Sequence, residues 1–232
     1  IGQGFIGGAP DGTTTTLGRE GSDYSAAVAA NILDAESMSV WKDVDGILNA
    51  DPKVFPDAVQ IAELNYLDTI ELAYSGAQII LQNKNIPLYV RPFGDKRKPG
   101  TVIRRMSAPI EVPILILKKD QVLLTIRSRD FSFVLEEKFA AIFSLLERYR
   151  IKVNLVHNSA VNLSLCVDNS WHIDEAIQAL RNEEFDVMKV ENMELLTIRG
   201  YNGDLMERYA SGPEVFLLQR TQSTARIVRK NR

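Results

Sequence analysis

Residues 4–33 read GFIGGAPDGTTTTLGREGSDYSAAVAANIL, and this stretch decides the fold class. Two apolar residues lead into glycines, a polar loop follows, and an alanine-rich segment predicts a helix over Tyr24–Leu33. The hydroxyl of Ser22 can cap this helix, and Asp23 suits the positive end of the helix dipole. A strand that passes through a glycine-rich loop into a helix is typical of an α/β protein.

Strands continue to alternate with helices through the first block, residues 1–103. Residues 39–44 and 86–90 are predicted strands, and helical spacing of apolar residues predicts a helix over 66–76. This alternation predicts a mainly parallel sheet covered on both faces, with ligands at the carboxyl ends of its strands. Lys, Arg, Gly and Pro then accumulate, which predicts a linker over 104–120.

The block 121–191 has the element order βαββαβ, which is the ferredoxin-like arrangement. Its predicted strands and helices lie, in order, at residues 122–126, 135–146, 152–157, 161–167, 173–180 and 185–190. The five residues LLTIR occur at 123–127 and again at 195–199, so a second, shortened copy of the module is predicted over 192–232.

Composition narrows the function. Hydrophobic residues make up 45% of the chain and charged residues 25%, as in ordinary globular proteins. The net charge of -3 argues against nucleic acid and anionic membranes as partners. The single cysteine, Cys166, excludes an intramolecular disulfide and favours the cytoplasm. His157 and His172 have no partner at ligand spacing, so no metal site is expected.

The polar segment before the first helix carries the clearest chemistry. Arg19 can hold a carboxylate through two parallel hydrogen bonds, and Asp23 can hold an ammonium group. Together they could recognise both ends of an α-amino acid. The alternative, a solvated loop with a good helix cap, stays open on spacing alone.

The same segment, preceded by Gly4-Phe5-Ile6-Gly7, resembles the signature of the aspartate kinases, although the family usually has glycine where Glu20 stands. The resemblance implies a catalytic role for Arg19 and Asp23. The substrate-binding residues that it implies are Phe5, Ile6, Gly7, Arg19, Ser22 and Asp23.

Residues 41–53, WKDVDGILNADPK, resemble the nucleotide segment of the amino-acid kinase superfamily, with a sharp turn expected at Gly46. The ATP-binding residues implied are Lys42, Asp43, Leu48, Lys53 and Gln78. Three of them depart from the family pattern: Lys42 replaces a threonine, Leu48 a tyrosine and Gln78 a lysine.

The second block resembles ACT domains, which hold an amino-acid effector at a module interface and pair into homodimers. The effector-binding residues implied are Ser128, Asp130, Phe131, Val153, Asn154 and Ser159. In the alternative interpretation Val153 belongs to the core and Asn154 is an ordinary strand residue.

The resemblance as a whole implies that ATP and L-aspartate give 4-phospho-L-aspartate and ADP, with Mg²⁺ arriving on the ATP and with feedback by lysine, threonine or both. The chain does not begin with methionine, and the family's Lys-Phe-Gly-Gly motif has no counterpart in it, so we expect an incomplete enzyme that does not catalyse by itself. A non-catalytic, amino-acid-binding regulatory subunit is the main alternative, and a glutamate 5-kinase type is a weaker one. The sequence leaves open whether dimers form tetramers and whether a homoserine dehydrogenase follows.

Overall fold

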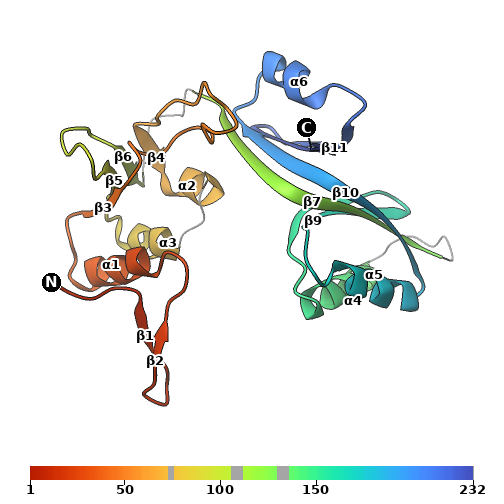
Figure 1. The fold of residues 1–232 in the computed structure, drawn as a ribbon, viewed down its shortest axis with the longest axis horizontal. Coiled ribbons are helices and arrows are strands. Elements are labelled where there is room, and N and C mark those ends of the chain that lie inside the picture. Colours follow the sequence, from red (N-terminus) through yellow and green to blue (C-terminus); the bar gives the residue numbers. More distant parts are fainter. Residues whose placement is uncertain (73–75, 106–111, 130–135, 232) are drawn as a thin grey trace. The chain divides into compact units, whose positions relative to one another are not determined.

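The computed structural model describes residues 1–72, 76–105, 112–129 and 136–231. The chain divides into two compact units, Ile1–Ile114 and Leu115–Arg232. Figure 1 shows helices and strands in both, and each unit is considered by itself below.

Unit 1 is built on a four-stranded sheet with the order β3-β5-β6-β4. Strand β3 is parallel to β5 and β4 is parallel to β6, while β5 and β6 are antiparallel. The mainly parallel sheet predicted from the sequence is therefore present, with one antiparallel pair at its centre. The elements are β1 (Ile6–Gly8), β2 (Thr14–Thr16), α1 (Gly21–Ile32), β3 (Met38–Lys42), β4 (Glu63–Asn65), α2 (Tyr66–Leu72), α3 (Gly76–Lys84), β5 (Leu88–Pro92) and β6 (Thr101–Arg104).

Helix α1 begins earlier than predicted and is capped differently. Its N-cap is Glu20, which has left-handed backbone angles (φ 62°) and no capping hydrogen bond from its side chain. Ser22 lies inside the first turn, so its predicted capping role is wrong. Gly21 is required because a Cβ there would lie 2.8 Å from Leu17 and 2.9 Å from Phe5.

The predicted helix over 66–76 is confirmed as α2 through Leu72, whereas residues 73–75 lie outside the described residues. Helix α3 was not predicted, and it lies beside α1 (Figure 1). The two helices are joined by a hydrogen bond of 3.0 Å, in which the side-chain amide of Asn31 donates to the backbone carbonyl of Ile80.

Unit 2 is built on a six-stranded sheet with the order β11-β12-β10-β7-β9-β8. Its elements are β7 (Ile114–Ser128), α4 (Glu136–Arg148), β8 (Val153–Asn158), β9 (Asn162–Asp168), α5 (Ile173–Asn182), β10 (Phe185–Arg199), α6 (Gly203–Ala210), β11 (Val215–Arg220) and β12 (Thr224–Lys230). The predicted order of strands and helices from β7 to β10 is observed. The predicted linker over 104–120 is wrong in its second half, because β7 begins at Ile114.

The two central strands, β7 and β10, are fifteen residues long and run side by side (Figure 1). The amide of Arg129, just after β7, donates to the carbonyl of Glu184, just before β10, so the strands run in opposite directions. Residues 121–127 of β7 pair with β9, and residues 193–199 of β10 pair with β12. The predicted boundary between the modules, 191/192, therefore falls inside one continuous strand.

The repeated LLTIR sequence is also a repeated geometry. Asp120 and Asn192, which precede the two copies, both have left-handed backbone angles (φ 53° and 57°). Their carbonyls accept from the amides of Asn169 and Asn231, at 3.1 and 2.9 Å. The second copy thus matches the first at the left-handed residue in the middle of each strand, three residues before LLTIR.

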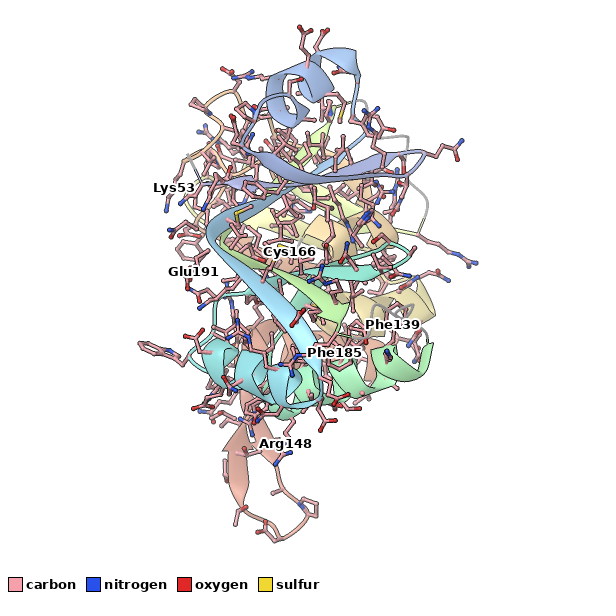
Figure 2. The ribbon with its side chains drawn as sticks, turned by 90° about the vertical axis from the view of Figure 1, so that its right-hand side faces the viewer. Lys53, Phe139, Arg148, Cys166, Phe185 and Glu191 are labelled. Atoms are coloured by element: carbon pink, nitrogen blue, oxygen red, sulfur yellow. The ribbon has the colours of Figure 1, made fainter. Side chains whose placement is uncertain are left out.

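Among the described residues of unit 2, buried apolar side chains include two clusters that join its elements. The larger packs β7 and β9 against α4 and α5, and Figure 2 shows Phe139 of α4 and Phe185 of β10 on this side. The second buries corresponding residues of the two modules. Leu123, Leu155 and Cys166 of the first module occupy the positions that Leu195, Leu217 and Val228 occupy in the second. The Gln219 side chain donates to the carbonyl of Val156 at 3.5 Å, so the sheet curves until its edge strands meet.

Candidate functional site

Strand β1 is held against the first turn of α1. The amide of Phe5 donates to the hydroxyl of Ser25 at 3.1 Å, and the carbonyl of Phe5 accepts from the amide of Leu17 at 2.9 Å. Phe5 itself has φ 73°, a strained backbone conformation for a bulky residue. A cleft of about 430 Å³ opens beside it, lined among others by Gly4, Ser22 and Ser25. Gly4 is the residue that lies close to Ser22, whereas Ile6 and Gly7 belong to β1, and Gly7 lies near Thr15 and Leu17 instead.

Arg19 and Asp23 flank the start of α1. Arg19 is exposed in the turn before the helix, where its guanidinium can reach a ligand. Asp23 lies in the first turn, and its carboxylate accepts from the ammonium of Lys42 at 2.7 Å. The sequence analysis assigned Asp23 to aspartate binding and Lys42 to ATP binding. Their contact was not predicted, because it depends on how β3 packs against α1.

The loop after β3 makes the sharp turn predicted at Gly46 (φ 151°). A Cβ at this position would lie 2.6 Å from the Gln60 amide nitrogen and 2.7 Å from the Thr101 hydroxyl. The Gln60 amide donates to the carbonyls of Asp45 (3.0 Å) and Gly100 (2.8 Å). The turn is therefore fixed from two sides.

The predicted ATP-binding residues lie on and after this loop. Lys42 is the last residue of β3, Asp43 is exposed next to it, and Leu48 is half-buried. Lys53 is exposed in the following turn, where its amide donates to Asp51 at 2.9 Å. Gln78 belongs to α3, but its side chain lies outside the described residues.

The predicted effector-binding residues are divided between the two ends of the β7-β9-β8 strands. Ser128 is buried and accepts from the ammonium of Lys138 at 2.7 Å, and Ser159 bonds locally to Asn162. Val153 packs against the larger apolar cluster, as the core interpretation of this residue expects. Asp130 and Phe131 lie outside the described residues.

Asn154 lies at the opposite end of these strands, in a polar network that the sequence analysis missed. Its amide nitrogen donates to Gln121 and Asp168, both at 2.7 Å, and its oxygen accepts from Lys118 at 2.8 Å. Burial raises the pKa of Asp168, but hydrogen bonds from Lys118, Gln121 and Asn154 outweigh it and the net pKa is lowered. Lys118 was not recognised as part of this network because residues 104–120 were predicted to be a linker.

Two further properties bear on ligands. Within the described ranges, no group of three or more His, Cys, Asp or Glu side chains could hold a metal ion. Across the same residues, no helix has both the length and the apolar character to cross a membrane.

Comparison with known proteins gives first a class and then particular relatives. Residues 1–91 match the model of the amino acid kinase family. Over 231 aligned residues, the chain is 34% identical to lysine-sensitive aspartokinase 3 of Escherichia coli strain K12. The alignment covers 93% of this chain and 51% of that protein. The chain thus spans about half the length of this relative.

Solved structures agree with the sequence matches. The structure of E. coli aspartokinase III in complex with aspartate and ADP superposes with a TM-score of 0.78 at 26% identity, covering 98% of this chain and 56% of that one. Clostridium acetobutylicum aspartate kinase gives 0.81 at 18% identity, covering 98% and 58%, and shows a shared fold. The mixed α/β fold is therefore that of aspartokinase structures.

Proposed function

We propose that this chain is part of an aspartate kinase and that unit 1 binds L-aspartate and ATP. The observation that carries the proposal is the placement of an exposed guanidinium, Arg19, and a carboxylate, Asp23, on either side of the start of α1. They are complementary to the two ends of an α-amino acid. The aspartokinase relatives, one of them solved with aspartate and ADP, support the same substrates.

In this proposal the protein positions two substrates and neutralises charge. The side-chain carboxylate of aspartate is ionised at neutral pH, so it attacks the terminal phosphoryl group without a general base. Arg19 and Asp23 orient the amino acid, and Lys42 and Lys53 face the phosphates. Magnesium supplies charge neutralisation when it arrives on ATP, since it takes most of its ligands from phosphates and water.

We assign unit 2 to amino-acid sensing by ferredoxin-like, ACT-type modules that pair into a homodimer. The strand order β10-β7-β9-β8, with the helices α4 and α5 between the strands, supports this assignment. Lysine is the first effector to test, because the E. coli relative is lysine-sensitive, and threonine is the second. Unit 2 has its own apolar clusters, which also suits a chain that senses amino acids without catalysing.

Calorimetric titration of the 232-residue chain with L-aspartate, succinate, ADP, lysine and threonine tests these assignments separately. Succinate keeps both carboxylates of aspartate but lacks the ammonium, so we expect it to bind at least about tenfold more weakly if Asp23 contributes a charged hydrogen bond. Arg19→Gln should abolish aspartate binding, whereas Arg97→Gln, which removes an exposed arginine of another loop, should leave it unchanged.

The outcomes separate the two units. Aspartate binding that survives Arg19→Gln contradicts the proposed substrate site. If the chain binds lysine or threonine but neither aspartate nor ADP, the result supports the regulatory-subunit alternative. Light scattering with and without the effector then tests the homodimer.

A further inference from the structure

The ion pair between Lys42 and Asp23 joins the two halves of the proposed site. The Lys42 ammonium lies 2.7 Å from a carboxylate oxygen of Asp23, and the two side chains are 41% and 25% exposed. Any substrate ammonium that approaches Asp23 therefore meets a carboxylate that is already neutralised. Aspartate can bind there fully only if Lys42 leaves.

The position of Lys42 gives it somewhere to go. It ends β3, and ligands of parallel sheets bind at the carboxyl ends of the strands. Its backbone is fixed, because the Lys42 carbonyl accepts from the Phe93 amide at 2.7 Å, so a displacement involves the side chain alone. A partly exposed ion pair is weak, and an ammonium has three donors, so a polyphosphate competes well for it.

We propose that Lys42 couples the two substrate sites. The phosphates of the nucleotide draw the ammonium away from Asp23, and the released carboxylate then accepts the ammonium of the amino acid. The nucleotide therefore strengthens aspartate binding and, by linkage, aspartate strengthens nucleotide binding by the same factor. This inference rests on the function proposed above and assigns Lys42 as a positioning residue that acts through Asp23.

The test is a titration of aspartate into the chain with and without saturating ADP, for the wild type and for Lys42→Met and Lys42→Arg. In the wild type we expect ADP to tighten aspartate binding about threefold to fivefold, the range that a partly exposed ion pair allows. In Lys42→Met the ratio should fall to about one, because aspartate already binds more tightly without ADP. Lys42→Arg keeps the cation and should keep the coupling.

A merely structural role for Lys42 would weaken aspartate binding in Lys42→Met rather than strengthen it without ADP. Circular dichroism of the variants verifies the fold. If the wild type binds both ligands and the ratio is one, or if Lys42→Met keeps the wild-type ratio, the coupling is refuted while the proposed function stands. If the wild type binds neither aspartate nor ADP, the proposed function falls and the coupling falls with it.

Discussion

The buried ion pair of the second module allows a quantitative test of how unit 2 is stabilised. Glu194 and Arg229 face each other across β10 and β12, with a nitrogen–oxygen distance of 2.7 Å and side chains that are only 4% and 6% exposed. In the first module the corresponding pair across β7 and β9 is Val122 and Val167. Two copies of one arrangement thus use an ion pair and an apolar pair at the same place.

The magnitudes follow from desolvation. Replacing one partner leaves a buried charge without its counter-ion, so Glu194→Leu and Arg229→Met should each lower the unfolding free energy by about 3–5 kcal/mol. The double variant has no charge to desolvate and approximates the apolar pair of the first module. It loses the contact between Arg229 and the Tyr209 ring, 5.5 Å away, which is worth about 1 kcal/mol. We expect it to lie within about 2 kcal/mol of the wild type.

Urea unfolding followed by circular dichroism measures the unfolding free energies of the wild type, the two single variants and the double variant. Hydrogen exchange of residues 193–199 and 224–230 assigns the transition to unit 2. The double-mutant cycle should give a coupling energy of several kcal/mol. Asp174→Asn removes a carboxylate that is 78% exposed from a pair with Lys189 in the same unit, and as a control it should cost less than about 1 kcal/mol. A double variant as unstable as the sum of the singles would refute the reasoning.

Three further predictions concern single residues. Glu20→Gly should raise the unfolding free energy by up to about 1 kcal/mol in urea titrations, because relief of a left-handed backbone, about 1–2 kcal/mol, exceeds the extra entropy of glycine in the unfolded chain. Burial, together with the charge of Asp168, raises the pKa of the Cys166 thiol to about 12. The stability that the buried neutral thiol contributes is therefore complete below about pH 8.5 and is lost as the pH rises toward 12. Cys166→Val, which copies Val228, should remove that loss, about 1.4 kcal/mol per pH unit, in urea midpoints compared between about pH 8 and 10. The pKa of Asp168 is lowered on folding, so its contribution is present above about pH 4 and is lost in more acidic solution, and Asp168→Asn should flatten the stability curve there.

Local patterns were sufficient where an element is stabilised by its own periodicity. The amphipathic helices α4 and α5 and the alternating strand β9 were predicted close to their observed bounds. Strand β6 was not predicted. It has four residues and pairs with β5, the preceding strand, and with β4, which is distant in sequence. A strand this short carries too little alternation to be predicted, and its pairing with β4 leaves no local signal.

The same distinction holds for the candidate site. The exposed position of Arg19 and the place of Asp23 in the first turn of α1 follow from the local sequence. The contact between Asp23 and Lys42 does not, because it forms between the start of a helix and the end of a strand. The network around Asn154 was missed for a similar reason, since Lys118 reaches it from the strand that was assigned to a linker.

The internal repeat shows why the modules of unit 2 cannot be treated as consecutive domains. The first half of β10 is the last strand of the first module, and its second half is the first strand of the second module. Because β7 runs antiparallel beside it, the first half of β7 lies next to the second half of β10. The left-handed residues Asp120 and Asn192 mark the midpoints of both strands. A cut at 191/192 would divide β10 and separate its second half from the first half of β7 beside it, so we expect the two modules to fold as one unit.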